Sequence, residues 1–129
     1  MWQELNAGGK HHPGREEVAA AAWLEQHEVG NRSLVQAFQR DLDLGESETI
    51  ALALELNADV ALLDEREGRH AAGRLGVRTL GVLGILLDAK AHAYIGTAKP
   101  HLDALRTVAG FYMRDAVYEQ VLALAAEIN

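Results

Sequence analysis

The chain has 129 residues, of which 49% are apolar and 24% are charged, a composition typical of a single globular domain and not of a disordered chain. Acidic residues outnumber basic ones by 19 to 12, and the net charge of −7 argues against loose electrostatic binding of nucleic acid. The absence of cysteine excludes disulfides and thiolate metal sites, and the lack of a long apolar run or of a secretory pattern near Met1 leads us to expect a cytoplasmic protein without a membrane partner.

The first half of the chain is predicted to be mainly helical. Asn31 or Ser33 can cap a helix, because each offers a side-chain oxygen to the free backbone N–H groups of the first turn. The expected elements are a helical stub over 2–5, a turn-rich stretch over 6–14, a short helix over 16–22, an edge strand over 23–29, a helix ending near 40 and a helix from about 46 to 56.

The second half alternates between apolar strands and helices. The run 59–64 is apolar between two acids, which predicts a strand buried on both faces. Then come a polar helix over 65–75 stopped by Gly76, a strand over 77–82, a mostly apolar helix over 83–92, and amphipathic helices over 100–109 and 114–128. Such alternation predicts βαβ units, a parallel sheet and an α/β fold.

Two acids occupy positions where a ligand site is expected. Asp64 ends a predicted strand, and Glu46 lies in the first turn of the helix that leads into this strand. Since such a helix begins at the end of the sheet where the strand finishes, the two side chains can converge on one crevice and bind Mg²⁺ or Mn²⁺. The alternative is structural: the helix dipole favours Glu46, and Asp64 can cap the following helix.

Basic residues follow Asp64 closely. Arg66, Arg69, Arg74 and Arg78 could contact an RNA backbone near the metal, or they could form the solvated face of a polar helix. The six histidines include no pair at helical spacing that would indicate a metal site.

The stretch from 42 to 66 carries a resemblance to a known family. It reads LDLGESETIALALELNADVALLDER and is similar to the middle of a PIN-like family of predicted nucleic-acid-binding proteins. Further matches cover 80–90, 99–105 and 110–122, so that the resemblance spans nearly the whole chain. It implies one PIN-like domain over 1–129, with a three-layer α/β/α arrangement around a small parallel sheet.

PIN domains gather three or four acids around one or two divalent ions and cut single-stranded RNA, often as the toxin of a toxin–antitoxin pair. By position, Glu46 matches the helix acid of the family, Asp64 its later strand-end acid and Glu67 a fourth carboxylate. Glu48 is a weaker alternative to Glu46, because two residues turn an α-helix by about 200°. The resemblance therefore implies a Mg²⁺- or Mn²⁺-dependent, toxin-like endoribonuclease with catalytic residues Glu46, Asp64 and Glu67.

The chain departs from the family pattern in two ways. The family opens with a central strand that ends in a metal-binding Asp, followed by two helices, and none of these is found ahead of Trp2. Val82 stands where a small hydroxyl residue is expected. We therefore expect the site to bind metal weakly and the enzyme to be weak or inactive.

The alternative is a non-catalytic PIN remnant that binds a protein partner or RNA. A sheet without its central strand would leave backbone groups unpaired, which favours a homodimer. The apolar residues at helical spacing between Phe111 and Leu124 form either core or a groove for an antitoxin helix.

Overall fold

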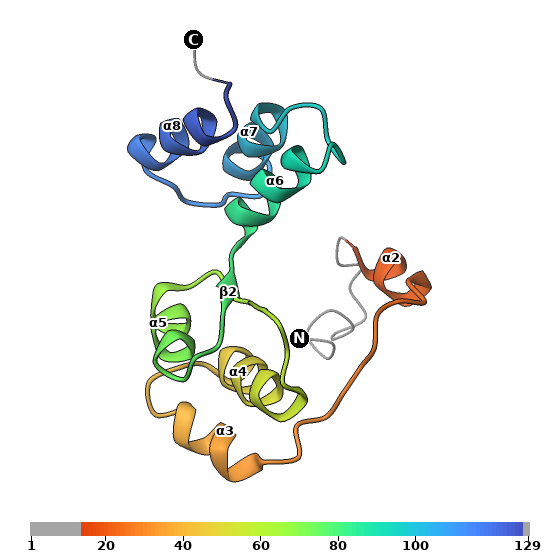
Figure 1. Ribbon diagram of the computed structural model, residues 1–129, viewed down its shortest axis with the longest axis vertical. Helices are drawn as coiled ribbons and strands as arrows, with labels where there is room; N and C mark the ends of the chain where they lie inside the picture. The colour runs from red at the N-terminus through yellow and green to blue at the C-terminus, as the bar shows by residue number, and fades with distance from the viewer. Residues whose placement is uncertain (1–13, 128–129) are drawn as a thin grey trace.

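The computed structural model describes residues 14–127, so the predicted stub and most of the turn-rich stretch lie outside the described residues. The described chain is rich in helices and contains a small sheet (Figure 1). Its elements are α2 (Arg15–Ala20), α3 (Arg32–Phe38), α4 (Leu44–Leu56), β1 (Ala61–Leu62), α5 (Arg66–Arg74), β2 (Thr79–Leu80), α6 (Val82–Ala91), α7 (Lys99–Thr107) and α8 (Asp115–Leu124).

The sheet has the predicted parallel arrangement. In the described residues it consists of β1 and β2, with Ala61 opposite Thr79 and Leu62 opposite Leu80. Helix α5 connects the two strands and ends as predicted, with Gly76 at a φ of 77° that suits glycine. The β1–α5–β2 segment is thus a short βαβ unit, and the α/β class is confirmed, whereas the three-layer arrangement stays a prediction.

The prediction that the first strand is buried on both faces is wrong for the described residues. Ala61 and Leu63 are buried, but Val60 and Leu62 are 43% and 55% exposed. Successive side chains of a strand point to opposite faces, and the core residues of α4 and α5 pack with Ala61 and Leu63 on one of these faces. One apolar face of β1 therefore remains open to solvent.

Helix α4 holds the core beside the sheet. Ile50 and Ala53 pack with Ala61 and Leu63 in one cluster, while Ala51 packs with Val35 of α3 in another. Small alanines on two sides of α4 allow α3 and β1 to approach it closely. The apolar residues of the predicted helix over 46–56 are thus explained, although the helix begins two residues earlier, at Leu44.

Helix α3 is capped from two directions. The Asn31 side chain accepts a hydrogen bond from the Leu34 N–H at 3.1 Å, as predicted. The Glu55 carboxylate, at the far end of α4, accepts from the Gly30 and Asn31 N–H groups at 2.9 and 3.3 Å. These bonds satisfy backbone donors that the helix cannot pair internally, and they tie α3 to α4.

The prediction of an edge strand over 23–29 is also wrong. The segment after α2 forms a turn and an extended link without a strand, and Trp23 is 81% exposed. The segment includes Glu25, Gln26, His27 and Glu28 in succession, so it cannot present an apolar face to a core. Only Val29 at its end is buried.

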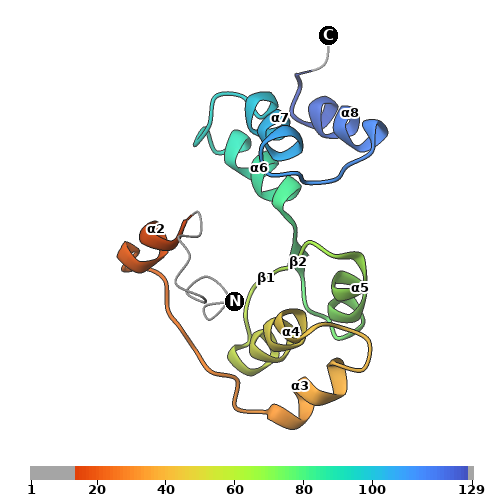
Figure 2. The ribbon, with the colours of Figure 1, turned by 180° about the vertical axis from the view of Figure 1, so that it is seen from behind.

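The last three helices form a group of their own on the other side of the connection between β2 and α6 from α3, α4 and α5 (Figure 2). Leu102, Met113, Val121 and Leu122 make its buried core. The prediction that the apolar residues after Phe111 include core positions is confirmed. No helix in the described part of the chain is long and apolar enough to cross a bilayer.

Glu127, just beyond the end of α8, connects α6 and α7 of this helical group. Its carboxylate accepts hydrogen bonds from the Ala98 and Lys99 N–H groups at 2.7 and 3.0 Å, where α7 begins, and from the Lys90 ammonium of α6 at 2.9 Å. One carboxylate thus caps α7 and links it to α6, because free N–H groups and the positive end of the helix dipole both favour a negative charge there. These contacts hold the pKa of Glu127 down at about 2.

Candidate metal centre

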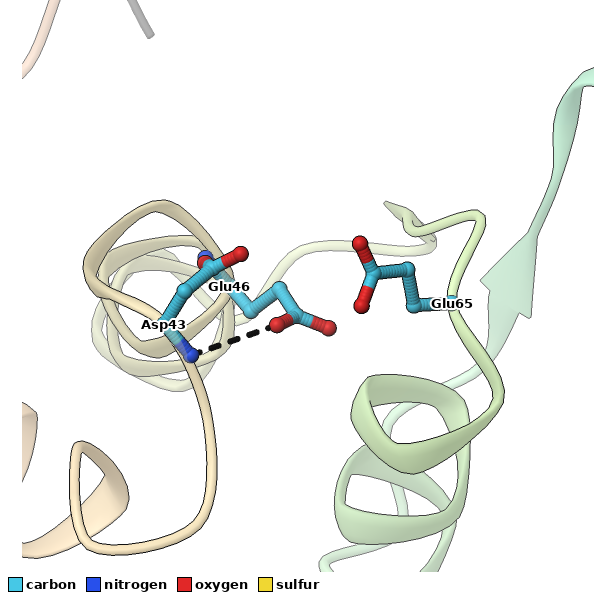
Figure 3. A group of neighbouring side chains, drawn as sticks. All are labelled: Asp43, Glu46 and Glu65. Carbon is cyan, nitrogen blue, oxygen red and sulfur yellow. Dashed lines mark hydrogen bonds between the residues drawn. The ribbon is translucent and has the colours of Figure 1, made fainter. Parts of the chain in front are cut away.

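Three carboxylates meet where α4 begins and where β1 leads into α5. Asp43 is the N-cap of α4, Glu46 lies three residues further on, and Glu65 is the N-cap of α5. Each offers one oxygen, and these oxygens all lie within 4.8 Å of one another. Figure 3 shows the Glu46 and Glu65 side chains extended toward each other across the space between the two helices. We call these three residues the acidic cluster.

Local sequence explains how α4 presents its two acids. Asp43 and Glu46 form a capping box: the Asp43 carboxylate accepts from the Glu46 N–H at 2.8 Å, and the Glu46 carboxylate accepts from the Asp43 N–H at 3.3 Å (Figure 3). These two bonds fix both side chains at the helix start. They also give one carboxylate oxygen of each residue a hydrogen-bond partner, so these two oxygens need no metal ion to be satisfied.

The second oxygen of Glu46 has a different environment. Among the described residues, Oε2 is the buried side-chain atom that has no hydrogen-bond partner. It faces α5 at Gly68, where a Cβ atom would lie only 2.6 Å away. Glycine at this position therefore leaves the room that the carboxylate occupies.

The charge on Glu46 is destabilised by its surroundings. Burial raises the pKa of Glu46 above its usual value, and repulsion from Asp43 and Glu65 acts in the same direction. A buried carboxylate oxygen without a donor is costly, and a cation would relieve both the missing partner and the repulsion. The donor set of three carboxylates suits a hard divalent ion such as Mg²⁺ or Mn²⁺.

Asp64 has a structural contact of its own. Its carboxylate accepts a hydrogen bond from the Val82 N–H, the first residue of α6, at 2.7 Å. It thus caps α6 in place of Gly81, which has no side chain, whereas the sequence suggested a cap on the helix directly after Asp64. Asp64 is not one of the three mutually close acids, and its binding of the same ion as Glu46 stays a prediction.

Glu67 lies apart from the acidic cluster. It is an exposed residue in the first turn of α5 and lines a cavity of about 510 Å³ between α3 and α5, together with His70 and Arg74. A role for Glu67 as a further metal ligand therefore stays a prediction without geometric support from the cluster.

Sequence reasoning identified Glu46 but missed its two neighbours. Asp43 could have been found, because Asp followed three residues later by Glu at a helix start is the pattern of a capping box. Glu65 had a weaker signal, since it follows directly on Asp64 at the end of the strand. Which of two adjacent acids turns toward α4 depends on how the chain enters α5, and the sequence alone does not fix that.

The predicted basic residues divide between two cavities. Arg66 and Arg69 line a cavity of about 670 Å³ with Asp64, at the junction of β2 and α6. Arg74 instead lines the cavity between α3 and α5, which Arg66 also borders, and Arg78 lines neither. The four residues thus do not form one surface.

A comparison with known families accounts for most of the chain. A family model described as a PIN domain matches residues 1–127. This chain belongs to the PIN domain family. Searches of curated proteins and of solved structures found no match. Membership of this family suggests a nuclease-type function and the binding of nucleic acid, and the acidic cluster of this PIN domain is able to hold the divalent metal that such a function uses.

Proposed function

We propose that this PIN domain is a metal-dependent endoribonuclease that acts on single-stranded RNA, with Glu46 as its central metal ligand. The observation that carries the proposal is the buried, unpartnered Oε2 atom of Glu46, which lies among carboxylates and not among hydrogen-bond donors. Asp43 and Glu65 would complete the set of oxygen ligands. Asp64 and Glu67 remain candidate catalytic residues from the resemblance.

The ion would supply Lewis-acid chemistry for the hydrolysis of a phosphodiester bond. The residues of the chain have distinct tasks around it. Asp43 and Glu46 hold each other through the capping box, so that their side chains are positioned before any ion binds. Glu65 adds a carboxylate from a second element, so that the cluster brings α4 and α5 together at one point. The choice between Mg²⁺ and Mn²⁺ rests on general ligand chemistry, which suits both.

We expect weak metal binding and weak activity. One oxygen each of Asp43 and Glu46 already accepts a backbone N–H, which leaves fewer lone pairs and less negative charge for a cation. The raised pKa of Glu46 means that a proton also competes with the ion. A toxin-like role and an antitoxin partner remain part of the proposal that rests on family resemblance, and the homodimer remains a proposal that rests on the incomplete sheet.

The test is metal binding and RNA cleavage by the purified chain. Mn²⁺ or Mg²⁺ is titrated by calorimetry, and cleavage of a labelled single-stranded RNA is followed with and without the ion. Glu46→Gln keeps an oxygen for the capping box but removes the charge, so we expect metal affinity and cleavage to fall at least about tenfold.

Glu48→Gln is the matched control, because Glu48 lies on the same helix and pairs with Arg32 at 2.8 Å outside the cluster. Equal metal affinity and equal cleavage in the parent chain and Glu46→Gln would reject the proposal. RNA binding without metal-dependent cleavage would instead identify the non-catalytic interaction module.

A further inference from the structure

The cavity of about 670 Å³ at the start of α6 gathers basic side chains in an otherwise acidic protein. Its lining includes Arg66 and Arg69 of α5 and Arg114, which precedes α8, whereas Asp64 is its single acidic residue. We call it the arginine cavity. In a chain with a net charge of −7, the convergence of three guanidinium groups from two separate elements on one cavity is an unusual local reversal of charge.

The side chains of these three arginines have no partners in the described part of the chain. None of the three guanidinium groups forms a hydrogen bond or an ion pair there, whereas those of Arg32 and Arg106 pair with Glu48 and Asp115 at 2.8 and 2.6 Å. The one carboxylate in the cavity, that of Asp64, is itself engaged by the Val82 N–H. The guanidinium groups are therefore available to an anion from solution, and their planar donor pattern suits phosphate oxygens.

The cavity also contains an aromatic side chain that is not used for packing. Tyr112 is 84% exposed although its neighbour Met113 is buried in the core of α6, α7 and α8. An exposed ring beside unpaired arginines is the combination by which proteins hold single-stranded nucleic acid, because bases stack on the ring while phosphates meet the cations. A protein partner would not require both features at once.

The arginine cavity adjoins the candidate metal centre through consecutive residues. Asp64 and Arg66 line the cavity, and Glu65 between them belongs to the acidic cluster. A strand bound in the cavity would therefore run beside the segment that carries Glu65.

We propose that the arginine cavity binds a segment of single-stranded RNA, with backbone phosphates at Arg66, Arg69 and Arg114 and a base stacked on Tyr112. This inference rests on the proposed nuclease function, since it names the surface that presents the strand to the acidic cluster. It replaces Arg74, which the sequence suggested, with Arg114 and Tyr112.

The test measures RNA binding without catalysis. A fluorescein-labelled short oligouridylate is titrated with the intact 129-residue chain in EDTA, and anisotropy is followed at several salt concentrations. Tyr112→Ala is expected to weaken binding at least about fivefold, the loss of one stacked base. Arg69→Gln and Arg114→Gln should each weaken binding and reduce the slope of log K against log salt by about 0.7, the value for one phosphate contact on a single strand.

Two matched controls locate the effect. Arg74→Gln removes the same charge from the same helix but from the other cavity, and Tyr94→Ala removes another exposed tyrosine, which stacks on His92. Both should bind oligouridylate within about twofold of the parent chain. Circular dichroism of each variant verifies that it is folded, which is expected for side chains this exposed.

The outcomes separate this inference from the proposed function. Weaker binding in the three cavity variants, with both controls unchanged, supports the inference. Equal weakening in cavity and control variants, or no measurable binding by the intact chain, overturns it. If Glu46→Gln loses metal-dependent cleavage but binds RNA unchanged in EDTA, the proposed nuclease function is supported. If the chain binds RNA at the cavity but never cleaves it, the RNA-binding inference stands and the nuclease function is rejected.

Discussion

At the scale of single residues, the two carboxylate oxygens of Glu46 differ in their contacts. Oε1 completes a capping box and would be expected in any well-capped helix. Oε2 is buried against α5 without a donor, which a cap does not explain. A cap needs only one carboxylate oxygen, so the second, buried oxygen is the feature that distinguishes a ligand site from a helix cap.

Gly68 gives the first prediction at this scale. A Cβ at this position would lie 2.6 Å from Glu46 Oε2, so Gly68→Ala should push the carboxylate out of the acidic cluster. We expect Mn²⁺ affinity to fall roughly tenfold, the lower end of the effect of residues that position metal ligands, as measured by calorimetry.

Gly73→Ala provides the control on the same helix. Nothing lies within 4 Å of a Cβ added at Gly73, so this variant should keep its metal affinity and gain about 0.5–1 kcal/mol of stability from the better helix former. Unchanged metal binding in both variants would contradict the proposed position of Glu46.

The roles of single residues were predicted correctly from the sequence where the residue acts only on its immediate neighbours in the chain. Asn31 was identified as a cap and Gly76 as a helix stop, because short-range geometry decides both. Glu46 was named from the helix start and the family pattern; it lies in the acidic cluster, and its binding of a metal stays a prediction. The contact of Asp64 with Val82 was missed, since it joins residues 18 apart in the chain and depends on how β1 and β2 align.

At the scale of elements, Glu127 shows how one side chain can organise three helices. It caps α7 and pairs with Lys90 of α6 from a position just beyond α8. Its pKa of about 2 in the folded protein lies below the usual 4.5, chiefly because it accepts the Ala98 N–H and the Lys90 ammonium. The folded state therefore binds this proton less readily than the unfolded state does.

The second prediction concerns acid stability. The contribution of Glu127 is complete above about pH 4.5 and is lost as the pH falls from there toward 2, because protonation removes the charge that the N–H groups and Lys90 bind. Glu127→Gln should lower the melting temperature at pH 6 and should lose less stability than the parent chain between pH 5 and pH 3. Thermal unfolding followed by circular dichroism measures both.

Glu119→Gln, on the exposed side of α8, is the control for this prediction. It should follow the parent chain at every pH. If Glu127→Gln and the parent chain lose stability in parallel as the pH falls, the role assigned to Glu127 is wrong.

The helices and strands were predicted well where their pattern is long and periodic. Helices α4 to α8 and both strands lie where the sequence placed them, with shifts of one to a few residues at their ends. The strand predicted over 23–29 does not form, because four polar residues in succession, 25–28, leave the segment without an apolar face to pack on a core. The predicted burial of Val60 and Leu62 was wrong because an apolar sequence shows that burial is favourable but not which neighbouring element would cover the side chains.

At the scale of the whole molecule, α3, α4 and α5 form one group and α6, α7 and α8 another, and the short connection between β2 and α6 joins the two (Figure 1). Asp64 and Val82 link the groups through one hydrogen bond at this connection, and the arginine cavity takes its lining from both sides of it. The proposed RNA site therefore depends on how the two groups are held together, which the sequence could not reveal.

The third prediction concerns self-association. Val60 and Leu62 expose one apolar face of a two-stranded sheet whose other face packs on α4 and α5, and removing such an apolar face from water is favourable. We expect a homodimer that covers this face, with twice the chain mass of 14.0 kDa by light scattering, and we expect Leu62→Lys to shift it toward the monomer.

Val108→Lys controls for a new charge at another exposed apolar residue, since Val108 is 85% exposed at the end of α7. It should leave the mass unchanged. A monomeric parent chain at all concentrations would remove the homodimer from the account.

The central claim, that a divalent ion binds among Asp43, Glu46 and Glu65, is tested most directly by adding Mn²⁺ to the ¹⁵N-labelled chain and following its amide signals by NMR. Paramagnetic broadening falls steeply with distance from the ion. We expect the amide signals of Asp43, Glu46, Glu65 and Gly68 to broaden first, and we expect Glu46→Gln to abolish this pattern. Broadening centred on acids elsewhere, such as Asp103 or Glu127, or none at all, would contradict it.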